Sequence, residues 1–379
     1  MKKVIFALAA VVALAACSQE DVIVADKGAA IGFDTFVENS TRSVYDPSYT
    51  NSNLFANFGV FGTVEGAELF NNKTVTGSEL KGTWTYEGIQ YWIAGAKYNF
   101  AAVAPKTVKV NDVDTPVYTN ASYAVTSSEV EGKTVYTGTT TLSFANNGKI
   151  DLLYAEATAE GKAGSGDAEN PANGKVGFNF RHVLSKVKFS FENAYNASNA
   201  TIRVKDVKIN DAYASGSVVL DGNTVWTPAN PTLALAFGNV ATNADDNAAT
   251  VDQNNKGLVL NYGDVVDSYN ELLMIPGQGS ADYTVKETTY TDVYRVTFTV
   301  ELLVSGQEVA QYNHTIYTTF APEAGMRYNL KAVIKPENID PEHSQEPILF
   351  TVNEINDWDN GNTKDSDDTD TENDYYPLN

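Results

Sequence analysis

The side chains that most often carry catalysis or bind metals are few and scattered in this sequence. The chain has 3 histidines in 379 residues, and His182, His314 and His343 lie far apart. None stands in a His-x-x-x-His or Glu-x-x-His spacing, which would bring two metal ligands to one face of a helix. A Gly-x-Ser-x-Gly nucleophile motif and a Gly-x-x-x-x-Gly-Lys phosphate loop are also missing from the sequence. We therefore expect no metal, no cofactor and no enzymatic activity.

His182 and the acidic C-terminal segment are the remaining candidates for chemistry. His182 stands among Phe180, Val183 and Leu184, a setting typical of a structural histidine. A calcium loop needs Gly at position 6 and Glu at position 12. Counted from Asp357, position 5 is Gly361 and position 12 is an aspartate. We expect residues 361–379 to form a solvated acidic tail.

Cys17 is the only cysteine, and it follows an apolar run at residues 4–16 that Lys2 and Lys3 precede. This layout is typical of a secretory signal and is shorter than the roughly 20 residues that span a bilayer. Leu14-Ala15-Ala16-Cys17 resembles the lipobox of bacterial lipoproteins, which implies that Cys17 is lipidated and becomes the new N-terminus. Several acyl chains would hold the protein durably at a membrane. The alternative is a free cysteine in an ordinary secretory signal.

The charge and the cysteine content exclude further classes of protein. The formal net charge is −22, with 48 acidic and 26 basic residues, so the chain repels phosphate backbones and we expect no nucleic-acid partner. Without a second cysteine there is no internal disulfide framework and no thiolate metal site. At roughly 100 to 200 residues per domain, the length suggests two domains.

Apolar residues recur with the period of β-strands. In residues 186–192 and 295–302 they alternate with polar residues, which indicates strands with one face in the core and the other in water. The apolar positions change parity between Val204 and Val207, which predicts a β-bulge. No stretch after residue 17 sustains an amphipathic helical pattern over three turns. The sequence predicts an all-β protein made of two sandwiches.

Two internal repeats suggest a duplicated architecture. Residues 94–105 (AGAKYNFAAVAP) are similar to residues 324–336 (AGMRYNLKAVIKP), and residues 31–34 (IGFD) to residues 176–179 (VGFN). The order is the same in both halves, so we expect equivalent strands in the two domains. Between the halves, residues 161–174 are rich in Gly, Ala, Asn and Pro, which predicts a linker or a long loop.

Several motifs together resemble the fimbrillin-type proteins, the type V pilins and related surface lipoproteins of anaerobic Gram-negative bacteria. These motifs are the lipobox, Tyr91-Trp92 before Lys97-Tyr98-Asn99-Phe100, DLLYA at 151–155, FRHVLSKV at 180–187 and INDW at 355–358. The resemblance implies two transthyretin-like β-sandwich domains in tandem and export as a lipoprotein to the outer membrane. In pilins of this type it also implies cleavage after an arginine by a surface protease.

The resemblance places this cleavage at Arg42, so that Ser43 would become the first residue; a surface arginine in a loop is an equal alternative. Just before it, Ile31, Phe33 and Val37 share one face of a predicted strand at residues 30–37. This is the candidate strand to be displaced on maturation. Residues 346–355 (EPILFTVNEI) are either the strand donated to a neighbour or a core strand of their own domain.

The expected organisation is a signal peptide at 1–16, an N-terminal segment at 17–42 that is the candidate for removal on maturation, two sandwiches at 43–172 and 173–360, and the tail. The expected function is a structural or adhesive subunit of fimbriae, assembled by β-strand exchange after cleavage near Arg42. Its partners would be other fimbrial subunits, a host or bacterial surface ligand, and the outer membrane through the lipid anchor. The alternative is a non-polymerising surface lipoprotein that binds glycans or host ligands.

Overall fold

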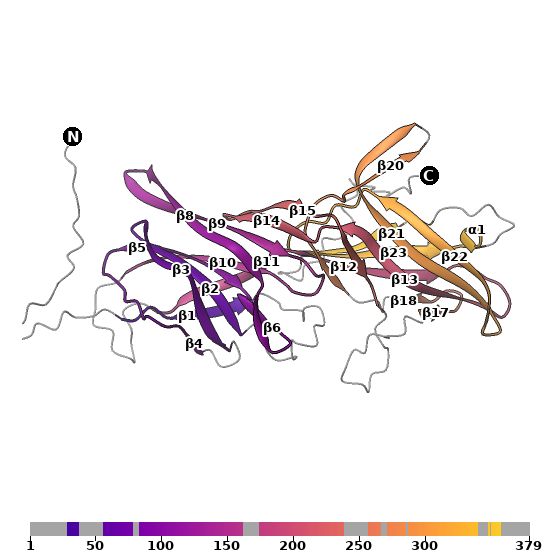
Figure 1. The fold of residues 1–379 in the computed structure, drawn as a ribbon, viewed down its shortest axis with the longest axis horizontal. Coiled ribbons are helices and arrows are strands. Elements are labelled where there is room, and N and C mark those ends of the chain that lie inside the picture. Colours follow the sequence, from indigo (N-terminus) through magenta and orange to yellow (C-terminus); the bar gives the residue numbers. More distant parts are fainter. Residues whose placement is uncertain are drawn as a thin grey trace, which may run out of the picture.

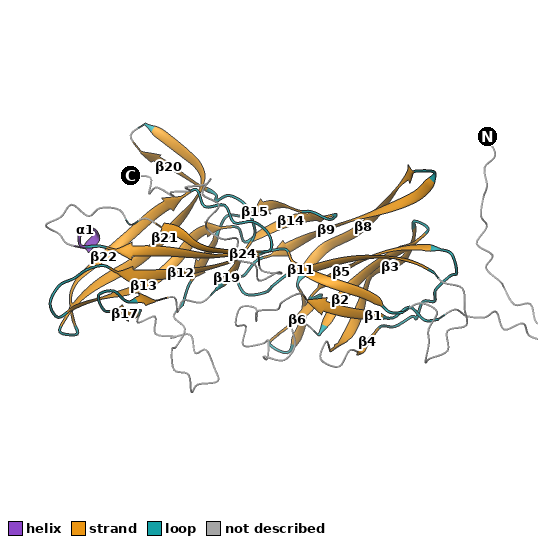
Figure 2. Cartoon of the chain, turned by 180° about the vertical axis from the view of Figure 1, so that it is seen from behind, coloured by secondary structure: helices purple, strands orange, loops and turns teal. Residues whose placement is uncertain are grey.

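The computed structural model describes residues 29–37, 56–78, 83–161, 174–238, 257–266, 271–285, 287–339, 348 and 350–357. In these ranges the regular structure consists of strands β1 to β24 and the four-residue helix α1, so the prediction of an all-β protein is confirmed. Figure 2 shows that strands dominate both ends of the molecule. Val, Ile, Thr, Tyr and Phe, which fit a pleated surface, are the residues that fill them.

The strands of the first sheet pair lie at the left of Figure 1. They are β1 (Phe33–Val37), β2 (Asn57–Val64), β3 (Ala67–Ser78), β4 (Thr83–Thr85), β5 (Lys97–Ala104), β8 (Tyr118–Val130), β9 (Lys133–Ala145), β10 (Leu153–Glu160), β11 (Val176–His182), β14 (Ser215–Leu220) and β15 (Thr224–Ala229), with a separate hairpin of β6 (Thr107–Val110) and β7 (Val113–Pro116). One sheet runs β1-β11-β10-β5-β2-β3-β4 and the other β15-β14-β9-β8. Apolar side chains of both sheets form one buried cluster, which includes Phe61, Val103, Leu142 and Val218.

The second sheet pair lies at the right of Figure 1. It is built from β12 (Ser185–Asn193), β13 (Ala200–Ala212), β16 (Leu233–Ala236), β17 (Leu258–Leu260), β18 (Val265–Val266), β19 (Leu272–Met274), β20 (Ala281–Val285), β21 (Thr288–Val304), β22 (Gln307–Thr318), β23 (Met326–Ile334) and β24 (Phe350–Asp357), with α1 (Pro336–Ile339) before β24. The sheets run β18-β12-β23-β24, with β19 on β12, and β16-β13-β21-β20, with β17 on β13 and β22 on β21. Their facing side chains form a second large core.

Two strand patterns in the second pair can be compared with the sequence. The register of β13 on β21 shifts between Lys205 and Lys208, so the predicted β-bulge is confirmed. In β12, by contrast, the polar face does not lie in water: Lys188 is 8% and Ser190 1% exposed. The prediction of a water-facing side is wrong here, because alternation shows which residues share a face and not what covers it.

The strands that follow residues 162–173 are shared between the two pairs. β11 continues the first sheet beside β10, and β14 pairs with β9. The division expected at residues 172 and 173 therefore falls between strands that pair in one sheet. β11 leads into β12 through Val183 and Leu184, both fully buried. A Gly- and Pro-rich segment predicts only that one strand has ended before the next begins, and it does not predict which sheet the next strand joins.

The two internal repeats have different structural meanings. The longer one falls on β5 and β23, each an inner strand of its own sheet pair. The shorter one does not mark equivalent strands of two domains. Its copies lie on β1 and β11, which are parallel neighbours in one sheet, with Phe33 opposite Val176. The expectation of equivalent strands is wrong for this repeat. Two short strands of similar sequence can also pair with each other in one sheet, as β1 and β11 do.

His314 on β22 gives the second core a dependence on pH. Its ring stacks on Phe298 with centroids 5.2 Å apart, and burial lowers the pKa of His314 to about 4. The neutral form is favoured in the fold, so its contribution to stability is complete above about pH 6.5 and is lost as the pH falls towards 4.

We expect His314→Phe, which keeps the ring stack, to remove part of the acid sensitivity between pH 6.5 and 4. The difference is at most about 3 kcal/mol and smaller to the extent that water reaches the partly exposed imidazole. Urea unfolding of both proteins at pH 7.0, 5.5 and 4.5 measures it, since their carboxylates titrate alike. Parallel pH dependences of the two proteins would contradict the assignment.

Candidate functional site

β1 closes the seven-stranded sheet on itself. It pairs over its whole length with β11 in parallel, beginning with Phe33 opposite Val176. On its other side it reaches β4, where the indole Nε1 of Trp84 donates a hydrogen bond of 3.0 Å to Oγ1 of Thr35. The two edge strands of the sheet therefore meet, and the sheet curls around an apolar cluster of its own.

Phe33 lies in the middle of this cluster. Its side chain is 1% exposed and that of Ile31 is 2% exposed. The ring centroid of Phe33 lies between 5.4 and 6.4 Å from those of five other rings: Phe58, Phe70, Tyr86, Phe100 and Phe178. Alternate residues of β1 thus face the core, with Thr35 also buried. The strand expected at residues 30–37 is present from Phe33, and its displacement stays a prediction.

Main-chain contacts extend the attachment of β1 towards its N-terminus. Ile31 donates its N–H to the carbonyl of Gln90 at 2.8 Å, and its own carbonyl accepts a 2.8 Å hydrogen bond from Oη of Tyr86. β11 pairs with β10 only at its C-terminal end, through Leu153 and Tyr154. Among the described strands, β1 is therefore the main backbone partner of β11.

The other residues expected to take part in maturation lie outside the described residues. These are Cys17, Arg42 and Ser43, together with the tail at 361–379. Val37 ends β1 and its backbone lies opposite Phe180. The candidate donor at 346–355 is placed in part: β24 pairs with β23, and Ile348 and Phe350 are 1% and 2% exposed within the second core. In this structure the described part of that segment forms the edge strand β24 of its own sheet, with Ile348 just before it.

Two of the motifs meet at His182. The side chain is 3% exposed, and its Nδ1 lies 2.6 Å from Oδ2 of Asp151. The backbone N–H of Val183 donates to the carbonyl of Leu152 at 3.1 Å. The structural role expected for His182 fits this geometry. Sequence reasoning missed Asp151 as its partner, although the DLLYA motif begins with that residue.

An ion cluster around a buried lysine follows in the same motif. Lys186 is 1% exposed, and its Nζ lies 3.4 Å from Oε2 of Glu271. Arg327 of β23 donates from Nε to Oε1 of the same carboxylate at 2.5 Å. Burial lowers the pKa of Lys186, while Glu271 and Asp151 act in the opposite direction. The cluster links β12, β23 and the residue before β19, so its role is structural.

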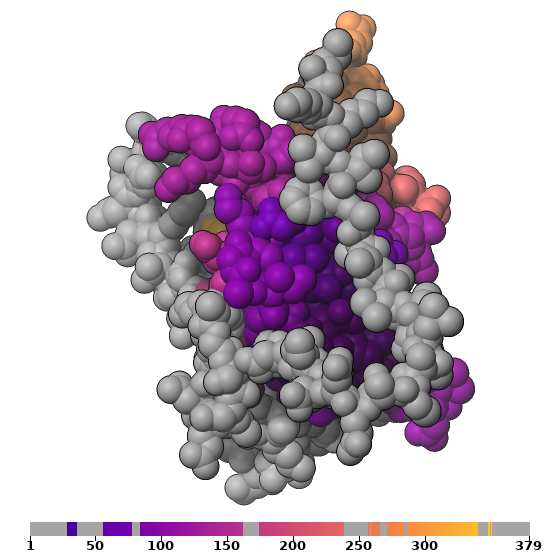
Figure 3. All heavy atoms as spheres, turned by 90° about the vertical axis from the view of Figure 1, so that its left-hand side faces the viewer, coloured from indigo at the N-terminus to yellow at the C-terminus, as the bar shows by residue number. Residues whose placement is uncertain are grey.

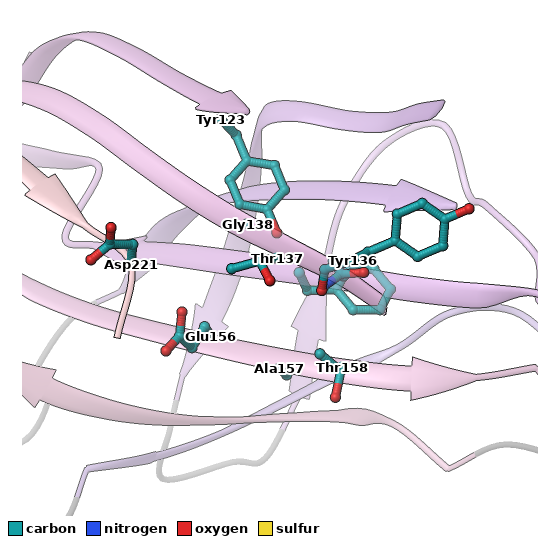
Figure 4. A pocket seen from close by; sticks show the side chains of 10 residues that line it. Tyr123, Tyr136, Thr137, Gly138, Glu156, Ala157, Thr158 and Asp221 are labelled. Carbon is teal, nitrogen blue, oxygen red and sulfur yellow. The ribbon is translucent and has the colours of Figure 1, made fainter. Parts of the chain in front are cut away.

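A cleft of about 310 Å³ lies between the hairpin β8–β9 and the seven-stranded sheet. Figure 4 shows its side chains, with Glu156 and Asp221 towards one end and Tyr136 and Thr158 towards the other. The lining comes from β5, β8, β9, β10 and the turn after β14: Asn99, Phe100, Tyr123, Tyr136, Thr137, Gly138, Glu156, Ala157, Thr158 and Asp221. Sequence reasoning missed this cleft. A local signal existed in β10, where every second residue after Tyr154 is polar.

The described ranges contain no group of three or more His, Cys, Asp or Glu side chains placed to hold a metal ion. No helix in the same part of the chain is long and apolar enough to cross a membrane.

The sequence matches the profile of the fimbrillin-like family over residues 41–358, and the chain belongs to this family. Similar solved structures include a candidate cell adhesion protein from Bacteroides ovatus, with 16% identity, 87% of this chain and 98% of that chain covered, and a TM-score of 0.43. The fimbrial anchor protein Mfa2 from Porphyromonas gingivalis has 11% identity, the same coverage of 87% and 98%, and a TM-score of 0.31. No curated protein matches the chain.

Proposed function

We propose that the protein is a structural or adhesive subunit of fimbriae that is exported as a lipoprotein. In this proposal Cys17 anchors the precursor in the outer membrane, cleavage between Arg42 and Ser43 releases the N-terminal segment, and subunits join by β-strand exchange. The partners are other fimbrial subunits and a ligand on a host or bacterial surface. Each sheet pair corresponds to one transthyretin-like β-sandwich, which a crystal structure of the mature chain would test.

The observation that supports this function best is the position of β1. The strand lies just before Arg42, contributes the buried Phe33 to the core and supplies most of the backbone partners of β11. Its loss would leave an unpaired strand edge beside an open row of aromatic side chains. Such an edge recruits an extended segment from another chain, which is the principle of β-strand addition.

A second function, that of a non-polymerising surface lipoprotein which binds glycans or host ligands, also has a specific observation in its favour. β24 is already paired with β23 in its own sheet. The apolar residues at its start are therefore not available to pair with another subunit. The cleft beneath hairpin β8–β9 would then carry the activity.

We expect Arg42→Ala to abolish the ladder of polymers seen on unboiled denaturing gels, because β1 stays in place and blocks the groove. Truncation after Asn360 should also abolish the ladder if the donor strand comes from the tail. Metabolic labelling with a palmitate analogue should mark the Arg42→Ala protein, which keeps acylated Cys17, and should leave Cys17→Ala unlabelled.

Ser43→Ala is the matched control, because it changes the neighbouring residue and keeps the arginine; it should retain the ladder. A ladder unchanged by Arg42→Ala would show that release of β1 is not the route of assembly. It would leave the second function as the better one.

A further inference from the structure

The cleft exists because one face of the seven-stranded sheet changes character along its strands. Where the four-stranded sheet packs on it, this face is apolar: Phe61, Ala101 and Val103 are fully buried. Further along, the strand register brings Asn99 of β5 opposite Thr158 of β10 on one side and Thr63 of β2 on the other. A polar row therefore replaces the packing residues under the hairpin β8–β9. Figure 3 shows this hairpin in magenta, standing out from the body of the first sheet pair.

Two tyrosines of the hairpin are held in fixed positions over this row. A Cβ atom at Gly138 would lie 2.1 Å from Oη of Tyr123, so only glycine lets that ring lie across β9. Tyr136 donates its hydroxyl to Oε2 of Glu65 at 3.1 Å, and its carbonyl accepts a 2.9 Å hydrogen bond from Nδ2 of Asn99. The rings are therefore preorganised before any ligand arrives.

Several polar groups in the cleft have bonding capacity to spare. Within the part of the chain that the structure describes, the side chains of Tyr123, Thr137, Thr158 and Asp221 make no hydrogen bond to protein. Burial, and to a lesser extent the charge of Glu156, raises the pKa of Tyr123 to about 12, so its hydroxyl keeps its proton at neutral pH and can donate. The lining contains two carboxylates and no basic side chain.

We propose that this cleft binds a terminal sugar ring of an uncharged glycan. The inference rests on the adhesive part of the proposed function and gives that part a site and a ligand class. The volume of about 310 Å³ lies at the lower end of the roughly 300 to 1,000 Å³ of small-ligand sites, which suits one sugar ring.

Sugar chemistry matches both ends of the cleft. The C–H face of a pyranose packs on a tyrosine ring, as apolar surface does, while its hydroxyls can donate to Glu156 and Asp221 and accept from Tyr123. An amine would use only the acidic end and would leave the hydroxyl of Thr158 without a partner in the ligand. A sialylated or uronic sugar would place its own carboxylate beside two others, which is unfavourable.

The test is an array of neutral oligosaccharides, each printed beside its sialylated form, such as lactose beside 3′-sialyllactose. The full-length protein should bind to the printed neutral glycans in preference to their acidic forms. By calorimetry on a retained neutral glycan, Tyr123→Phe should weaken binding about tenfold through loss of one hydroxyl, and Tyr290→Phe, an exposed tyrosine on β21, should leave it unchanged.

The double variant Glu156→Gln with Asp221→Asn should keep the fold and reduce the discrimination against the sialylated form, because it removes only charge. Retention of no neutral glycan, retention of an oligolysine peptide in their place, or equal effects of the two Tyr→Phe variants would overturn the assignment. Tyr123→Phe should leave the polymer ladder intact, and Arg42→Ala should leave glycan binding intact. Failure of the cleft is thereby distinguishable from failure of strand exchange.

Discussion

Replacing Phe33 with alanine is expected to lower the free energy of unfolding of the first sheet pair by about 3 to 5 kcal/mol, as truncation of a buried phenylalanine does. The side chain is 1% exposed, and the surrounding rings come from several strands of the curled sheet. A shift of one strand therefore cannot fill the cavity that the substitution leaves. Guanidinium unfolding of the full chain, followed by tryptophan fluorescence, measures the change because Trp84 and Trp92 lie in the same cluster.

Asp34→Asn is the control on the neighbouring residue. It breaks the ion pair between Asp34 and Lys175, whose side chains are 37% and 49% exposed, and exposed pairs contribute about 0 to 1 kcal/mol. A loss of stability in Phe33→Ala no larger than in this control would show that β1 is an accessory strand and does not hold the core together.

Replacing Glu271 with alanine is expected to cost up to about 3 to 5 kcal/mol, the range for removing one partner of a fully buried ion pair; the 19% exposure of the Glu271 side chain lowers the cost within that limit. Lys186 is 1% exposed, and burial already lowers the pKa of its amine. Without Glu271 the carboxylate of Asp151, which is bonded to His182, would have to compensate the buried charge.

Lys186→Met should cost much less than Glu271→Ala, because Glu271 keeps Arg327 as its partner and methionine fills similar space. Chemical denaturation of the two variants beside the unchanged protein gives the comparison. If the two variants lost equal free energies of unfolding, the charge of Lys186 would itself stabilise the fold. The cost of Glu271→Ala would then not come from a buried ammonium left without its partner.

The local features of this fold can be predicted from the sequence because they depend on neighbours in the chain. Alternation identified β12 and β21, and the change of parity after Val204 identified the bulge in β13. The apolar positions of residues 30–37 likewise predicted the face on which Ile31 and Phe33 are buried. A period of two is a property of the backbone, and a few residues suffice to show it.

The partners of these strands could not be predicted in the same way. β1 pairs with β11, and the cleft gathers residues from four strands and a turn whose positions run from Asn99 to Asp221. Many strand pairings satisfy the same alternation, and the choice among them is made by packing over the whole sheet. For this reason His182 could be assigned a structural role from its neighbours, whereas Asp151 as its partner could not.

The sharing of strands between the two sheet pairs has a consequence for the order of folding. β1 can pair with β11, and β9 with β14, only after the later strand of each pair has been synthesised. The buried cluster between the first two sheets also includes Leu273 and Ile275, which come later still. A chain that is delivered from its N-terminus cannot complete its first core before most of its length has arrived. Until then its strand edges and apolar side chains stay open to wrong partners, and pairings this distant in sequence form slowly. The N-terminal half is therefore the part of the molecule that most needs protection while the chain is being synthesised.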